Sequence, residues 1–107
     1  MLSIVYVTTD TVNQAQDLAH TVVSERLAAA GNVLGPVSSV FWWEGAVRQA
    51  SEAALILKTR SELVPELIDR LQTLHSYLCP GILSWNIHST TPDYQDWVHK
   101  ETTPEES

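Results

Sequence analysis

Basic residues and cysteines are scarce in this chain of 107 residues. Six lysines and arginines stand against 13 aspartates and glutamates, which gives a formal net charge of −7. Because nucleic acid backbones and anionic membrane surfaces repel a negative chain, this balance argues against both as partners. The single cysteine, Cys79, leaves no internal disulfide and no cysteine-rich zinc site. No apolar run approaches the ~20 residues that a membrane helix needs.

The first ten residues, MLSIVYVTTD, also lack the basic region of a secretory signal peptide. They favour a strand instead, so we expect a cytoplasmic protein. Apolar residues make up 44% of the chain, which is typical of a globular protein. We predict one domain over residues 1–100, followed by a polar tail at 101–107.

Hydrophobic spacing and turn signals predict alternating strands and helices. Strands are expected at 2–8, 32–43, 46–59 and 82–88, and helices at 11–30, from Ser61 to just before Ser76, and from Thr91 onward. The turn at Glu44–Gly45 joins 32–43 and 46–59 into a long hairpin. The order βαββαβ predicts a ferredoxin-like α+β sandwich with four antiparallel strands, two helices on one face and a short C-terminal helix.

The long hairpin predicts self-association. Val40–Trp43 and Ala53–Leu57 are continuous apolar runs, whereas a sheet with one wet face alternates. Fourteen residues span about 46 Å, but a compact chain of this size has a radius of gyration of only about 13 Å. A closed homo-oligomer would cover the second face and the overhang. The alternative is an ordinary core and a shorter strand that bends near Gln49–Ser51.

Four segments carry a resemblance to a known family. They are VFWWEG at 40–45, ERLAAA at 25–30, the turn HSYLCPG at 75–81, and Asp93–Tyr94 with Trp97. Together they resemble the CutA family of divalent-ion tolerance proteins. The resemblance implies a homotrimer held by the long hairpins, so a trimer interface is expected at Val40, Phe41, Trp42, Trp43, Glu44, Gly45, Leu55 and Leu57.

The resemblance also implies metal chemistry, since copper binding is described for some members. Most matching donor positions are replaced here, at Val7, Leu74, Leu78 and Gly81. Only His75 remains, and one imidazole does not make a copper or zinc site. A Cu²⁺ or Zn²⁺ site would need His75, Cys79 and His88 to converge. The alternatives are that Cys79 is a small buried hydrophobe and His88 a strand residue facing solvent or a cleft.

A second group of polar and aromatic residues suggests a ligand cleft. Arg48, Lys58 and Arg60 share one face of the third strand, and Tyr77, Tyr94 and Trp97 add flat apolar walls. By resemblance, the turn after the second helix borders an intersubunit cleft, as in the PII signalling proteins. Lys58 with Tyr77 would hold a small anionic ligand there. Alternatively, Lys58 pairs with Glu44 or Glu52, and the aromatics fill the trimer core.

The chain shows no motif of nucleophilic or nucleotide-dependent catalysis. We therefore expect a binding protein and not an enzyme. Three functions stay open: a metal-linked binding protein, a PII-like sensor or carrier of a small anion, and a non-catalytic scaffold for protein partners.

Overall fold

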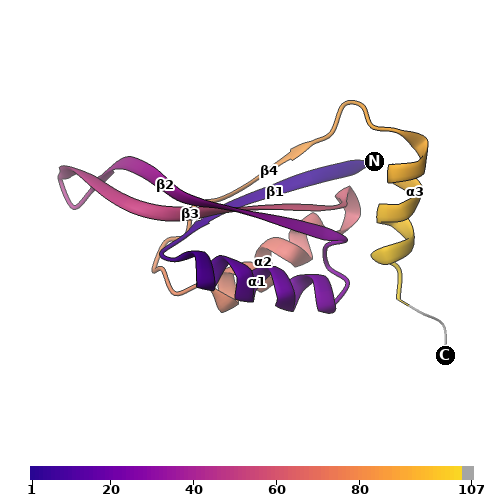
Figure 1. Ribbon diagram of the computed structural model, residues 1–107, viewed down its shortest axis with the longest axis horizontal. Helices are drawn as coiled ribbons and strands as arrows, with labels where there is room; N and C mark the ends of the chain where they lie inside the picture. The colour runs from indigo at the N-terminus through magenta and orange to yellow at the C-terminus, as the bar shows by residue number, and fades with distance from the viewer. Residues whose placement is uncertain (105–107) are drawn as a thin grey trace.

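A four-stranded antiparallel sheet carries two helices on one face (Figure 1). The computed structural model describes residues 1–104. The strands are β1 (Leu2–Thr9), β2 (Ala30–Trp43), β3 (Ala46–Arg60) and β4 (Ile82–Asn86), in the order β2-β3-β1-β4. The helices are α1 (Val12–Ser24), α2 (Val64–Leu74) and α3 (Pro92–Glu101), with a 3₁₀ turn at Ser61–Leu63 before α2. The predicted βαββαβ sandwich is confirmed.

The first helix ends six residues before its predicted end at residue 30. Arg26 has φ of 62°, a left-handed conformation that ends a helix. The N–H groups of Leu27 and Ala28 both donate to the carbonyl of Val22, which closes the turn into β2. Gly31 therefore lies in a strand, where an added Cβ would be 2.9 Å from Leu57 Cδ2. Its role is close packing, not helix termination.

Two other predicted boundaries differ. Ser61 does not cap α2, because its hydroxyl is hydrogen-bonded to that of Ser3 at 2.7 Å. The predicted tail at 101–107 begins too early, since α3 includes Glu101 and Thr102 is buried. The last three residues of that tail lie outside the described residues.

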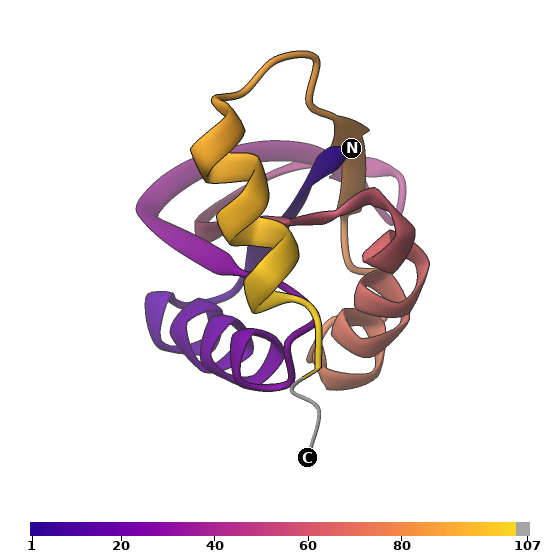
Figure 2. The ribbon, with the colours of Figure 1, turned by 90° about the vertical axis from the view of Figure 1, so that its right-hand side faces the viewer.

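The core lies between the sheet and the pair α1 and α2, which lie side by side beneath it (Figure 2). Alternate strand residues point into it, so Leu55 and Leu57 of β3 contact the helical layer and are fully buried. The prediction that these two leucines line a trimer interface is therefore wrong. Their neighbours of opposite parity, such as Ile56, face the other side.

The hairpin overhangs its own domain, as predicted. β1 pairs with β3 only from Arg60 to Ala53, and beyond that point β2 and β3 pair with each other alone. The molecule measures 49 × 30 × 22 Å, with a radius of gyration of 14.6 Å. The ladder runs without a break past Gln49–Ser51, so the alternative of a bend there is wrong.

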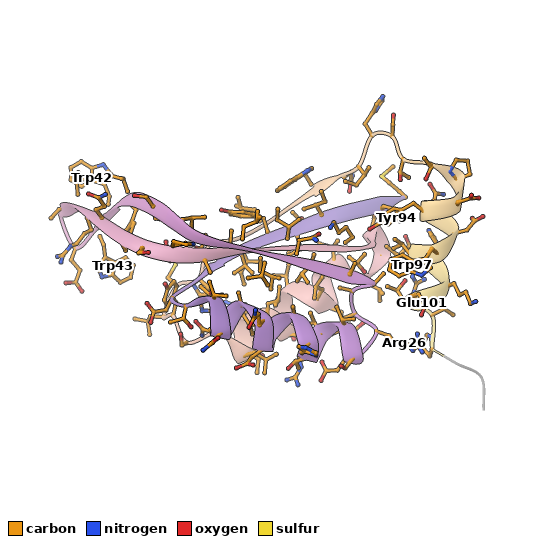
Figure 3. All side chains as sticks on the ribbon, in the orientation of Figure 1. Arg26, Trp42, Trp43, Tyr94, Trp97 and Glu101 are labelled. Atoms are coloured by element: carbon orange, nitrogen blue, oxygen red, sulfur yellow. The ribbon has the colours of Figure 1, made fainter. Side chains whose placement is uncertain are left out.

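The one irregularity in the β2–β3 ladder is a bulge between Leu34 and Val37. Leu34 is opposite Ala54 and Val37 is opposite Glu52, so β2 has one extra residue there. Because side chains alternate, this extra residue exchanges the two faces of β2 beyond the bulge. Figure 3 shows the result at the tip, where Trp42 and Trp43 project to opposite sides of the hairpin.

The sheet face opposite α1 and α2 is largely uncovered. Leu34, Leu83 and Trp85 are 50%, 59% and 48% exposed, and β4 and β2 are the two free edges. α3 covers only one end of the molecule, where Val98 packs with Leu2 (Figure 1). An apolar sheet face of this kind is typical of a surface that another chain covers.

Candidate functional site

A cavity lies between the overhanging hairpin and the turn that follows α2. Its volume is about 680 Å³. Its lining residues are Thr8, Ser39, Val40, Phe41, Trp43, Arg48, Gln49, Ala50, Glu52, Tyr77, Leu78 and Cys79. The bulge in β2 matters here, because it places Phe41 opposite Arg48 on one face of the ribbon. The cavity thus combines aromatic walls with one basic and one acidic side chain.

Hydrogen bonds fix the turn on one side of the cavity. The ring of His75 is buried, its Nδ1 accepts the Tyr77 N–H at 3.0 Å, and its Nε2 lies 2.7 Å from the carbonyl oxygen of Thr8. These two partners assign the neutral tautomer in which Nε2 carries the proton and donates. Both nitrogens are therefore engaged, and neither offers a lone pair to a metal.

Tyr77 joins this turn to the hairpin. Its hydroxyl donates to Glu52 Oε2 at 2.6 Å, and its ring lies 4.6 Å from that of His75. Burial raises the pKa of Tyr77, and the hydrogen bond and negative charge of Glu52 raise it further. Tyr77 therefore remains a neutral donor, and the charge of the pair resides on Glu52.

The three predicted metal ligands do not meet within one chain. His75 lies beside Thr8, whereas His88 follows Ile87, whose N–H donates to the carbonyl of Leu2. Leu2 and Thr8 are six positions apart on β1, or about 20 Å. Nowhere in residues 1–104 do three His, Cys, Asp or Glu side chains form a group that could hold a metal ion. Cys79 is exposed, so its alternative role as a buried hydrophobe is wrong.

The predicted cleft residues are also divided between the two ends of the molecule. Tyr77 lines the cavity, whereas Lys58 is paired with Ile4 and Ala30 near the opposite end. Within the described chain Lys58 forms no ion pair, so its predicted pairing with Glu44 or Glu52 is absent.

The other three cleft residues lie on or beside α3. Arg60 donates from Nε and Nη2 to the hydroxyl and carbonyl oxygens of Thr102, both at 2.9 Å. Tyr94 and Trp97 stack on α3 with ring centroids 5.7 Å apart, at the end remote from Trp42 and Trp43 (Figure 3). Arg60 therefore acts as an anchor for α3, and its guanidinium is already bound.

Sequence reasoning singled out Arg48 but did not combine it with Glu52 in one site. Arg48 Nε donates to the carbonyl oxygen of Trp43 at 3.3 Å, and Glu52 accepts from Tyr77. Both residues have the same parity on β3, and this was the available signal. Parity alone did not indicate a site, because the turn that completes the cavity comes from a distant segment of the chain.

The remaining predicted interface residues form the hairpin tip. Val40, Phe41, Trp42 and Trp43 are all exposed, and Trp42 is 74% exposed. Glu44 and Gly45 form the tight turn with φ of 50° and 77°. Large apolar side chains thus project beyond the domain that could have buried them.

Comparison with known proteins shows the family. The model of the "CutA1 divalent ion tolerance protein" family matches residues 3–101. The "Divalent-cation tolerance protein CutA" of Archaeoglobus fulgidus is 36% identical over 98 residues, which cover 92% of this chain and 95% of that one. "Protein CutA" of Mus musculus is 32% identical over 94% of this chain. The chain spans only 57% of that mouse protein and 56% of the rice "Protein CutA 1, chloroplastic".

Solved structures agree. The structure titled "Periplasmic divalent cation tolerance protein CutA" from Archaeoglobus fulgidus superposes with a TM-score of 0.93 at 34% identity, over 96% of this chain and all of that one. The CutA1 structure from Thermus thermophilus gives 0.92 at 32% identity, with the same coverage. In the described residues, no helix has the length and apolar character needed to cross a membrane. Sequence and fold together show that the chain belongs to the CutA1 family of divalent-ion tolerance proteins.

Proposed function

We propose that this chain is a non-catalytic, homotrimeric binding protein that acts in tolerance of divalent metal ions. Family membership supports the tolerance role. The observation that supports assembly is the uncovered sheet face, where Leu34, Leu83 and Trp85 are each about half exposed. Water penalises such a surface by about 25 cal/mol for each Å² of apolar area. Copies of the same chain cover this face in the proposed particle.

The overhanging hairpin supports a closed ring of copies. It carries exposed apolar side chains on both sides and leaves β2 as a free edge. An unpaired edge of this length templates aggregation unless a partner covers it. In a closed trimer, each hairpin reaches the next copy, and no free edge is left to continue the assembly.

Direct binding of Cu²⁺ or Zn²⁺ is proposed only between copies. Cys79 and His88 are exposed and lie near opposite ends of β4, so contact between two copies is the way to bring them together. Thiol and imidazole are donors that both metals accept. Calorimetric titration of the assembled protein should show binding that is weakened in Cys79→Ser and in His88→Ala. A flat titration with both metals contradicts direct binding.

The tolerance role is tested in cells. Deletion of the gene should increase sensitivity to graded Cu²⁺ or Zn²⁺, and the wild-type chain should restore growth. An assembly-defective variant, Leu83→Glu, should fail to restore growth, whereas Gln72→Glu on the exposed side of α2 should succeed. Fractionation of the same cells checks the proposed cytoplasmic location. Equal growth of deleted and complemented cells in both metals contradicts the tolerance role.

A second candidate function is binding of a small charged ligand. The supporting observation is the cavity of about 680 Å³, which falls in the range of small-molecule sites. Its charged groups are Arg48 and Glu52, not the predicted Lys58 and Arg60. A thermal-shift screen of small carboxylates and amines tests this function. The scaffold role stays a prediction.

A further inference from the structure

We propose that the cavity between the hairpin and the turn after α2 binds a small planar zwitterion. Its carboxylate is bound by Arg48 and its ammonium group by Glu52. This inference rests on the second candidate function and names the chemical class of the ligand. Four features support it: a cation with free donors, an anion with a free acceptor, aromatic walls, and the separation of the two charges.

The cation is Arg48. Its Nε donates to the carbonyl oxygen of Trp43 at 3.3 Å, which orients the guanidinium from the hairpin turn. Its two Nη groups have no partner in residues 1–104. Two parallel N–H donors of this kind match the two oxygens of a carboxylate. Arg48 therefore provides an oriented but unoccupied site for one negative group.

The anion is Glu52. Its Oε2 accepts the hydroxyl of Tyr77 at 2.6 Å, while Oε1 has no partner among the described residues. Because Tyr77 remains protonated, it orients the carboxylate without neutralising it. The free Oε1 can accept a hydrogen bond from an ammonium group, and the charge of Glu52 strengthens that bond.

Arg48 and Glu52 lie on one face of β3, four residues apart, so their Cα atoms are about 13 Å apart along the strand. Ala50 lies between them and contributes only a methyl group to the floor. Phe41 and Trp43 on β2 line the same cavity and offer flat apolar walls. A planar ligand with opposite charges at its two ends satisfies both side chains, whereas a ligand with like charges at both ends is repelled by one of them.

Three matched probes test the charge pattern by isothermal titration of the assembled protein. They are 4-(aminomethyl)benzoate, which has both charges, 4-methylbenzoate, which lacks the ammonium group, and benzylamine, which lacks the carboxylate. We expect the zwitterion to bind about tenfold more tightly than either singly charged probe, because each contributes one charge-assisted contact fewer.

Two variants assign the ends of the ligand. Arg48→Gln should reduce the affinity for the zwitterion about tenfold and leave the affinity for benzylamine nearly unchanged. Glu52→Gln should also reduce the affinity for the zwitterion about tenfold, but leave the affinity for 4-methylbenzoate nearly unchanged. Tyr77→Phe keeps the charge of Glu52 but frees its side chain, so a several-fold loss confined to the amine-bearing probes is expected. Arg70→Gln is the matched control, since this partly exposed arginine is bound to Glu25 on the helical layer.

The outcomes separate the two levels of the proposal. If none of the probes binds, the ligand function of the cavity and the zwitterion inference both fail. If the probes bind but the zwitterion has no advantage, or if Arg48→Gln and Glu52→Gln leave the order of affinities unchanged, the inference fails and the ligand function survives. Circular dichroism of each variant shows that its fold is intact.

Discussion

Replacement of Leu83 by glutamate tests whether the open sheet face is an interface. Leu83 lies on β4, opposite Tyr6, and is 59% exposed in one chain. A leucine side chain moved wholly from water into an apolar site contributes about 1.5–3 kcal/mol, so about 1–2 kcal/mol per copy remains to be gained on assembly. A buried, unpaired carboxylate adds a penalty of about several kcal/mol per copy.

These contributions act in every copy of a trimer, so Leu83→Glu should weaken assembly by roughly 10 kcal/mol in total. Within one chain the same change at an exposed position costs only about 0.5 kcal/mol. Sedimentation velocity should therefore show wild type as a particle of three 11.9-kDa chains and Leu83→Glu as single chains that are still folded.

Gln72→Glu is the control, because it adds the same charge to the exposed side of α2. It should sediment like wild type. The reasoning is refuted if wild type sediments as a single chain at micromolar concentration. It is equally refuted if Leu83→Glu remains a trimer of unchanged stability.

Three further predictions test the fold. Arg60→Met removes the guanidinium contacts that anchor α3, so it should cost about 2 kcal/mol in urea unfolding and increase amide exchange mainly in α3. Gly31→Ala forces a Cβ into contact at 2.9 Å and should lower stability by about 1 kcal/mol in thermal unfolding, whereas Gly81→Ala meets nothing within 4 Å and should leave it unchanged. The Arg70 hydrogen bond lowers the pKa of Glu25 below 4.5, so this pair stabilises the fold above that pH and the effect disappears as the pH falls. The stability difference between wild type and Glu25→Gln should therefore shrink on acidification, and a difference that does not change with pH would argue against the pair.

The strand and helix order was predictable because each element carries its own periodicity. The overhang followed from strand length alone. Which residues of β3 face the core was not predictable, because Ala53–Leu57 is apolar throughout and shows no alternation of apolar and polar residues. In the structure, Leu55 and Leu57 face the helices, whereas Ile56 faces the open side.

The site was less predictable than the fold. His75 was predicted as a metal ligand and Tyr77 as a cleft residue, but their hydrogen-bonding partners Thr8 and Glu52 come from β1 and β3. No local pattern encodes such long-range contacts. The end of α1 was missed for a similar reason, since Arg26 adopts a left-handed conformation without the glycine that normally signals it.

The bulge between Leu34 and Val37 inserts one unpaired residue into β2. Deleting that residue would remove the bulge but keep the partners of the other residues, so Phe41 would stay opposite Arg48 and Trp42 opposite Val47. The ribbon would lose the extra twist that a bulge adds, and the hairpin would leave the domain at a different angle. A single-codon deletion would thus redirect the hairpin relative to the next copy while the residues that line the cavity stay the same.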